Sequence, residues 1–204
     1  CCVGLMGAFA FGGPLELVPD NHATITAAIA AVDPGGVVRI TDSSVYAENV
    51  VVTADRANIR IEAASGTHPT IQCPAASTAT YAIQTLQPCQ IGSNAGGQIT
   101  IDVNSNTNVS RVFDNFQPAG TLVCENLKVI NVNPTQYIIR PRLGNETYRN
   151  VDIDATAGTS VYAIRADSIG TGQVLTLSYV QCIGAYRALI CYGAPNGAGT
   201  INID

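Results

Sequence analysis

Charged side chains are scarce in this sequence, and tryptophan is absent. Lys, Arg, Asp and Glu together make up 12% of the 204 residues, and the net charge is −5. Nucleic-acid-binding proteins carry a basic patch, and this charge balance leaves none, so we expect no nucleic acid partner. No apolar run reaches the ~18–20 residues that a helix needs to cross a bilayer, so we expect no membrane span.

Metal ligands in a familiar spacing are also lacking. The sequence has two histidines and seven cysteines without a Cys-x-x-Cys pair, which argues against zinc, and we expect no metal and no cofactor. Disulfides in an exported protein explain the cysteines better. Cys73 with Cys89, and Cys182 with Cys191, are the possible bridges. Because the sequence starts at Cys1 and not at Met, we expect an extracellular or cell-surface protein whose signal peptide has been removed.

Short β-strands and turns dominate the expected structure. Val, Ile, Thr and Asn are frequent and 19 residues are Gly, which is typical of an all-β chain rich in turns. Residues 24–32 are the exception, because Ile25, Ala28 and Ile29 share one face at helical spacing and Pro34 follows. We expect a short helix that caps the first coil of the β structure, since a bare end strand invites unwanted pairing.

Pairs of apolar residues separated by one position return along the chain. They are Val38/Ile40, Ile59/Ile61, Ile101/Val103, Leu127/Val129, Val151/Ile153, Val180/Cys182 and Ile201/Ile203. When the widest gap is divided in two, the repeat is roughly 20–30 residues, which indicates stacked parallel coils. Clusters of Asn, Ser and Gly between the pairs suit the corners of such coils. We therefore expect a β-solenoid.

Four motifs within residues 21–72 point to a family. They are Thr24-Ile25-Thr26-Ala27-Ala28-Ile29, Val38-Arg39-Ile40, Val45-Tyr46-Ala47-Glu48-Asn49-Val50 and Ile59-Arg60-Ile61. In this order they resemble the first coils of the pectin-lyase-like β-helix family, with spacing most similar to pectin methylesterases, although Ser44 replaces the family's usual Gly. The resemblance implies a single-stranded right-handed parallel β-helix of about seven or eight coils over residues 21–204. The motifs serve the first coils and not the active site, so they indicate a fold and not an activity.

An enzymatic function is one possibility. The catalytic motifs of pectin methylesterases are absent. Only Val112-Phe113-Asp114-Asn115-Phe116 is weakly similar to one of them, which makes Asp114 a candidate catalytic residue. Pectate lyases of this fold hold Ca²⁺ with stacked carboxylates and use Arg or Lys as the base. By that resemblance, a polysaccharide lyase or esterase acting on uronate polymers would use Arg140, Arg142, Asp152 and Asp154.

The same residues also have a purely structural interpretation. Arg140 and Arg142 flank a proline and would form a solvated turn. The outward positions of successive strands place Lys128 between Asp102 and Asp152, and a cation there opposes metal binding and favours an exposed row of charges. Asp152 and Asp154 nevertheless share one face of a strand, where a weak metal site stays possible.

A structural, self-assembling function is the other main possibility. Residues 1–20 are apolar and Gly-rich, and we expect them to dock either on the end of their own β core or on a neighbouring copy. Residues 201–204 form a strand with no cap after it, which a second copy could cover head to tail to give a filament or fibre. The residues expected at such contacts are Cys1, Cys2, Val3, Leu5, Met6, Phe9, Phe11, Ile201 and Ile203.

Tyrosines gather in the last third of the sequence and define a third possibility. They include Tyr137, Tyr148, Tyr162 and Tyr179, and a face lined by them would suit a ligand or partner, such as the glycan of a tail-spike-type or adhesin-type β-helix. We favour a secreted, self-assembling β-solenoid. The alternatives are a uronate lyase or esterase and a glycan-binding β-helix. The expected partners are copies of the chain itself and, in the last two cases, an acidic polysaccharide.

Overall fold

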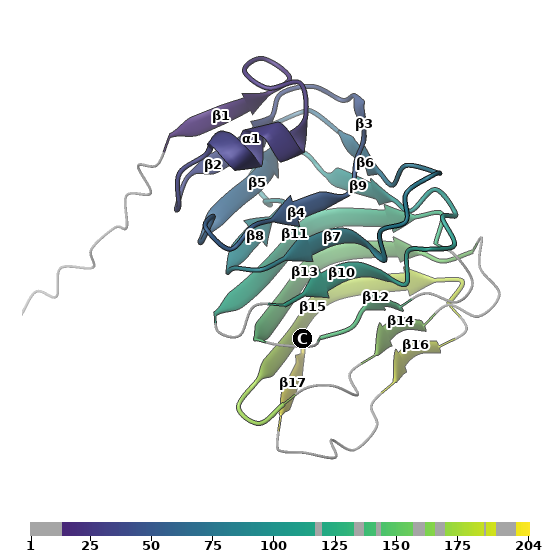
Figure 1. Cartoon of the computed structure of the whole chain (residues 1–204). Helices are drawn as coiled ribbons and strands as arrows, with labels where there is room; N and C mark the ends of the chain where they lie inside the picture. Colours follow the sequence, from purple (N-terminus) through teal and green to yellow (C-terminus); the bar gives the residue numbers. More distant parts are fainter. Residues whose placement is uncertain are drawn as a thin grey trace, which may run out of the picture.

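The structure is a computed structural model, and it describes residues 14–116, 120–132, 137–141, 144–156, 162–165, 170–185, 187–190 and 199–204. Within these residues, parallel strands stack along one axis, and a single short helix lies at the N-terminal end of the stack (Figure 1). This is the expected β-solenoid. No described helix has the length and apolar character needed to cross a membrane.

The helix, α1 (Ile25–Ala31), forms where its apolar spacing predicted it. Thr24 is extended and its side chain accepts a hydrogen bond from the amide of Ala27 at 3.1 Å, so it caps the helix. Ile25, Ala28 and Ile29 are buried. These contacts place the helix over the first coil, against β1 (Leu15–Val18), β2 (Val37–Ile40) and β4 (Val50–Val52).

The larger sheet has eleven strands, all paired in parallel. Its main path is β1, β2, β5 (Ile59–Ala63), β8 (Cys89–Ile91), β11 (Thr121–Ile130), β13 (Asn145–Asp154), β15 (Val174–Ile183) and β17 (Thr200–Ile203). Three short strands extend it: β3 (Val45–Ala47) pairs with β6 (Thr70–Gln72), which pairs with β9 (Ile99–Asp102), and β9 pairs with β11.

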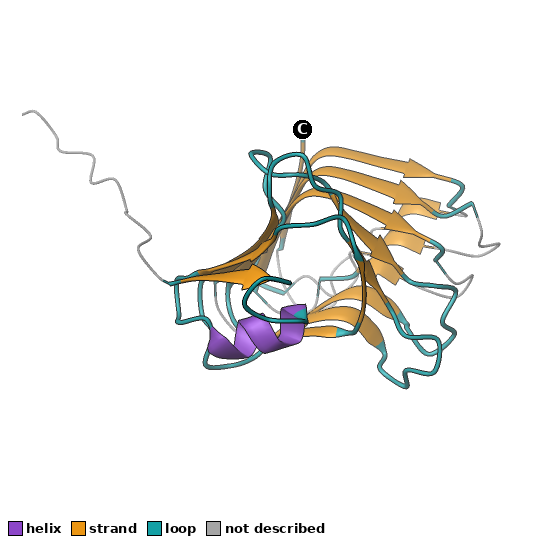
Figure 2. Cartoon of the chain, turned by 90° about the horizontal axis from the view of Figure 1, so that it is seen from above, coloured by secondary structure: helices purple, strands orange, loops and turns teal. Residues whose placement is uncertain are grey.

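The smaller sheet has six strands, one from each coil. Their order is β16 (Arg187–Ile190), β14 (Tyr162–Arg165), β12 (Tyr137–Ile139), β10 (Arg111–Asn115), β7 (Tyr81–Thr85) and β4. Six strands in series delimit about five turns, somewhat fewer than the seven or eight expected. The view down the stack shows the two sheets enclosing the interior (Figure 2).

The register matches the expected apolar pairs in the middle of the larger sheet and differs from them on either side. In β11, β13 and β15 the expected pairs lie opposite one another: Leu127, Val151 and Val180 form one row, and Val129, Ile153 and Cys182 form the next. The strand before them contributes Ile99 and Ile101, not Ile101 and Val103. After them, Ile201 and Ile203 pair with Leu175 and Leu177, not with Val180 and Cys182.

The observed register differs from the expected one because each long strand bends in its middle. β11, β13 and β15 are 10 residues long, and each carries one inward apolar step before the bend and another after it. A sequence pattern of period two cannot tell the two halves apart. The same shift corrects the expected charge row, because Thr100, not Asp102, lies opposite Lys128.

Asparagine forms the bend in two of the three strands. Asn126 and Asn150 have left-handed backbones, with φ of 55° and 51°, and the Nδ2 group of Asn150 donates to Oδ1 of Asn126 at 3.2 Å. Asn126 donates in turn to the carbonyl of Ser93 at 3.2 Å. Asn tolerates this conformation better than most residues. In β15 the same position is Tyr179, with φ of 52°.

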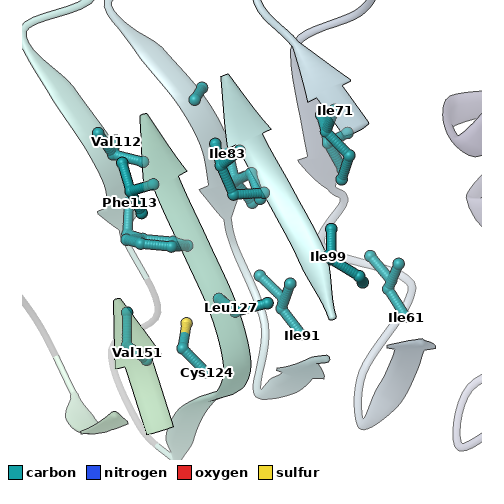
Figure 3. Packing of buried hydrophobic residues seen from close by; sticks show 14 of the residues in the cluster. Ile61, Ile71, Ile83, Ile91, Ile99, Val112, Phe113, Cys124, Leu127 and Val151 are labelled. Atoms are coloured by element: carbon teal, nitrogen blue, oxygen red, sulfur yellow. The ribbon is translucent and has the colours of Figure 1, made fainter. Parts of the chain in front are cut away.

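Stacked aliphatic side chains fill the interior. Ile61, Ile91 and Cys124 lie in register along the larger sheet, and Ile83 and Phe113 face them from the smaller sheet (Figure 3). All are at most 1% exposed. One row of the larger sheet departs from this composition, because it consists of Ile59, Cys89, Leu122, Glu146, Leu175 and Ile201.

The family-like motif of residues 45–50 has a structural role in the first coil. The carboxylate of Glu48 accepts hydrogen bonds from the amides of Ile25 and Thr26, each at 2.8 Å, and from the Thr26 hydroxyl. Asn49 donates to the carbonyl of Tyr81 on the next coil at 2.7 Å. The motif thus joins the capping helix to the first coils.

Candidate functional site

Aromatic and basic side chains lie in register along the smaller sheet. Tyr81, Arg111, Tyr137 and Tyr162 lie opposite one another on four successive strands. They are half-buried, whereas Ile83, Phe113, Ile139 and Ile164 further along the same strands are at most 6% exposed and belong to the core. The half-buried Arg140 and Arg165 directly follow two of these core residues, and the buried Asp114 follows a third. Together with the four residues in register they form the group that we call the Tyr–Arg face.

Close contacts hold the Tyr–Arg face together. The rings of Tyr137 and Tyr162 stack, with centroids 5.5 Å apart and planes 23° from parallel. The guanidinium carbons of Arg165 and Arg140 lie 4.7 Å and 5.3 Å from the centroid of Tyr137. Arg165 also donates to the Tyr137 hydroxyl. A cation over a tyrosine ring gains about 0.5–2 kcal/mol, depending on its exposure to water.

Like charges meet on this face. Arg140 and Arg165 follow paired residues on adjacent strands, so their backbones are only ~5 Å apart. Arg111 forms an ion pair with the buried Asp114 at 3.3 Å. Three guanidiniums and one carboxylate therefore belong to the described part of this face. This arrangement suits an anion, because planar guanidiniums bind a carboxylate through two parallel hydrogen bonds.

The structure brings two of the predicted catalytic residues to this face and leaves two elsewhere. Arg140 and Asp114 belong to the Tyr–Arg face, whereas Asp152 and Asp154 lie in β13 of the larger sheet. Arg142 lies outside the described residues. The described residues proposed for a lyase site are therefore apart, with Arg140 next to β12 of the smaller sheet and Asp152 and Asp154 in the larger sheet.

The two aspartates of β13 have local partners. Asp152 lies between Lys128 and Gln181 in register, as predicted. Asp154 accepts hydrogen bonds from the amide and hydroxyl of Thr156, at 3.0 and 2.6 Å, and these bonds lower the pKa of Asp154. Among the described residues, no group of three or more His, Cys, Asp or Glu side chains is arranged to hold a metal ion.

The described cysteines are free thiols. Cys73 and Cys89 are buried and unbridged, so the structure does not contain the disulfide considered for them. They lie on different parts of the core, since Cys89 begins β8 between Ile59 and Leu122. Burial raises the pKa of each thiol to about 12. Cys182 is free and half-buried, and Cys191 lies outside the described residues.

The expected assembly contacts are only partly within the described residues. Cys1, Cys2, Val3, Leu5, Met6, Phe9 and Phe11 lie outside them. Residues 15–18 of the expected docking segment form β1 and pair with β2. At the other end, Ile203 is 64% exposed, and Ile201 is partly buried against the core. On the side of β15 away from β13, no described strand pairs with residues 178–183.

The residues of the Tyr–Arg face were predicted from the sequence only in part. Tyr137 and Tyr162 were expected on a shared face and do lie together, but Tyr148, from the same cluster, is fully buried, and Tyr179 is 83% exposed in the larger sheet. Arg111 and Arg165 were missed. Arg111 precedes its apolar strand segment as Tyr81 does, and Arg165 follows its segment as Arg140 does. An alignment of these short strands would have identified both arginines.

Comparisons with protein-family models, with curated proteins and with solved structures found no match to this chain. The parallel β-solenoid is compatible with the pectin-lyase-like family that residues 21–72 resemble. The function proposed below is therefore based on the contacts of the Tyr–Arg face.

Proposed function

We propose that this chain is a pectin-lyase-like β-helix that binds an acidic polysaccharide on the Tyr–Arg face. The observation that carries the proposal is the stacked pair of Tyr137 and Tyr162 with the guanidiniums of Arg140 and Arg165 around it. Tyrosine rings offer flat apolar contacts to sugar rings, and the guanidiniums offer hydrogen bonds to sugar carboxylates. We expect such a protein to act at the cell surface or outside the cell.

Binding without turnover is favoured by the state of the nearby carboxylate. Asp114 is 2% exposed and is paired with Arg111, so it is poorly placed to exchange protons with a ligand. General acid–base catalysis needs a group within hydrogen-bond reach of the substrate. A ligand on the Tyr–Arg face would meet arginines and tyrosines first.

The test is calorimetric titration with oligogalacturonate, with a fully methyl-esterified oligomer of equal length as the neutral control. We expect binding of the acidic oligomer only, and weakening at high salt because the contact is electrostatic. Arg165→Ala should weaken binding roughly 10–100-fold, the effect of losing a charge-assisted hydrogen bond of about 1.5–3 kcal/mol.

Matched controls lie on the other sheet. Arg149 is 52% exposed there, and Tyr179 is 83% exposed, so Arg149→Ala and Tyr179→Ala should leave affinity unchanged, while Tyr162→Ala reduces it. Equal losses from Arg149→Ala and Arg165→Ala would show that the acidic oligomer binds through overall charge, and would contradict the proposed site. Absence of binding to every acidic oligomer would reject the function.

We propose self-assembly as a second function, favoured by the last described coil. On the side away from β13, residues 178–183 of β15 have no strand partner in the described part of the chain, and Tyr179, Ile183 and Ile203 are 83%, 52% and 64% exposed. A parallel edge with exposed apolar residues can accept a strand from a second copy. The described strands within each sheet are parallel, so head-to-tail addition would continue the sheet as a filament.

Electron microscopy at increasing protein concentration tests this assembly. Filaments should form, and Ile183→Lys should abolish them by placing a charge at the edge, whereas Thr53→Lys, in an exposed turn of the first coils, should not. Deletion of residues 1–13 tests the docking segment, and reductant tests Cys1 and Cys2. Dispersed monomers at all concentrations would contradict the assembly function without affecting the glycan-binding proposal.

A further inference from the structure

A glutamate lies inside the solenoid, in a row of otherwise apolar or thiol side chains. Glu146 in β13 is 2% exposed and lies opposite Leu122 of β11 on one side and Leu175 of β15 on the other. An ionised carboxylate in such a place loses its hydration, and that loss has to be offset by hydrogen bonds or by a counter-charge.

The compensation for Glu146 is incomplete. The hydroxyl of Tyr148, itself fully buried, donates to Oε2 at 2.8 Å. The other oxygen, Oε1, has no hydrogen-bond partner among the described residues. The side chain of Asn115 reaches the carboxyl group from the smaller sheet and favours its ionised form, but it brings no positive charge.

The charged and titratable groups around Glu146 do not neutralise it. Asp114 on β10 adds a negative charge, although Arg111 pairs with Asp114 at its outer side. Cys124 on β11 and Cys89 on β8 are the nearest thiols, and burial raises the pKa of both, Cys89 to about 12. Tyr148 also stays protonated, because burial and Glu146 raise its pKa well above the ordinary value. None of these groups supplies a cation.

We infer that Glu146 is a buried proton-binding site that couples the packing of β11, β13 and β15 to pH. When protonated, the carboxyl group is neutral and suits its apolar row. When it ionises, the interior holds an uncompensated charge, and the coils around it loosen. This inference does not depend on either proposed function.

The direction of the pH dependence follows from the pKa. Burial is the largest cause of the raised pKa of Glu146, about 7 against an ordinary 4.5, and the Tyr148 and Asn115 bonds only partly oppose it. A group with a raised folded-state pKa stabilises the fold fully below its unfolded pKa. That stabilisation is lost as pH rises through the folded pKa. The stability of these coils should therefore fall between pH 4.5 and 7.

The test compares the full chain with Glu146→Gln in urea unfolding at pH 5 and pH 8. Glutamine keeps the shape and cannot ionise. Relative to Glu146→Gln, the unfolding constant of the wild type should rise on the order of 50- to 100-fold between these pH values, as the two pKa values require. Glu62→Gln is the matched control, because Glu62 is similarly buried but is paired with Arg39 and Arg60 at 2.8 Å.

A measurement on the wild type covers the case in which Glu146→Gln does not fold. Amide exchange of β13 and β15, corrected for intrinsic rates, should accelerate from pH 5 to pH 8 relative to that of β2 and β5. Parallel pH profiles for wild type and Glu146→Gln, or uniform acceleration in all coils, would overturn the inference.

Discussion

Two glutamates show how the first and last coils of this molecule differ. Glu48, in the first coil, accepts hydrogen bonds from two helix amides and a hydroxyl. Glu146, near the other end, accepts one from Tyr148 and leaves Oε1 without a partner among the described residues. The first carboxylate lies at a helix N-terminus, where negative charge is favoured, and the second lies between leucines.

The first and last coils also differ in the asparagine side chains that bond to the backbone. The first coils are bound to one another by hydrogen bonds from Asn49, Asn106 and Asn126 to carbonyl groups of neighbouring coils. In β15 the exposed Tyr179 occupies the place of the bend asparagine. These asparagine side chains of the first coils therefore stabilise the stacking of the solenoid, and at the bend of β15 a tyrosine stands in place of such an asparagine.

The substitution expected to reduce the free energy of unfolding most is Gly97→Ala, which tests how closely the first coils are packed. At Gly97 an added Cβ would lie 1.6 Å from the carbonyl oxygen of Thr67 on the preceding coil. The clash is with backbone, so Gly97→Ala should destabilise the fold by at least about 3 kcal/mol. Urea unfolding measures this loss.

Gly66→Ala is the control for that substitution. Gly66 has φ of +79° and no atom within 4 Å of an added Cβ, so only the cost of the left-handed backbone applies, about 1 kcal/mol. Similar losses for the two variants would show that the coils move apart easily, and the contrast between the two ends would then disappear.

Glu48→Gln should have the next largest effect. The amide would lose the charge that favours the helix N-terminus and would turn an NH₂ group toward backbone donors. We expect a loss of about 2–3 kcal/mol, the range for hydrogen bonds to charged groups. The amides of Ile25 and Thr26 should exchange faster. If their exchange is unchanged, Glu48 does not hold the helix on the first coil.

Most of the fold could be predicted from the sequence because its signals are local. Helical spacing and Thr24 located α1, and repeated apolar pairs located the stacked strands. The register could not be predicted, because the two halves of β11, β13 and β15 carry equivalent apolar steps. Only the left-handed Asn126 and Asn150 mark where one half ends.

The candidate site was harder to predict, because it depends on which short strands stack. Tyr137 and Tyr162 are far apart in the sequence and meet only through the pairing of β12 and β14. Arg140 and Asp154 are closer in sequence than Arg140 and Arg165, yet the coil places Arg140 and Asp154 on different sheets. The burial of Glu146 could not be predicted, because it depends on the stacking of β11, β13 and β15, which places Glu146 between Leu122 and Leu175.

Tyr148→Phe tests the partial compensation of Glu146, with a smaller expected effect. The Tyr148 hydrogen bond lowers the pKa of Glu146, so its loss should raise that pKa further. At pH 5 the carboxyl group is protonated in both proteins and the cost should be small. At pH 8 the cost should be about 1.5–2 kcal/mol, the lower part of the range for one hydrogen bond to a charged group. Equal costs at both pH values would mean that the bond does not depend on ionisation.

The smallest expected effect is a gain in stability at Tyr179. Tyr179→Asn would place at the bend of β15 the residue found in β11 and β13, with a side chain able to donate to Asn150 as Asn150 donates to Asn126. Asparagine also adopts the left-handed backbone at a lower cost than tyrosine. We expect a gain of about 0.5–1 kcal/mol.

Tyr179→Phe separates the two possible causes of that gain. Phenylalanine keeps the bulk of the ring and its unfavourable backbone, so it should not stabilise the fold, and a gain for both variants would mean that loss of the hydroxyl is responsible. If Tyr179→Asn stabilises the monomer and also prevents filaments, then tyrosine at this bend lowers the stability of the monomer but contacts a second copy. If it stabilises the monomer and filaments persist, the exposed edge assembles through Ile183 and Ile203 without the tyrosine ring.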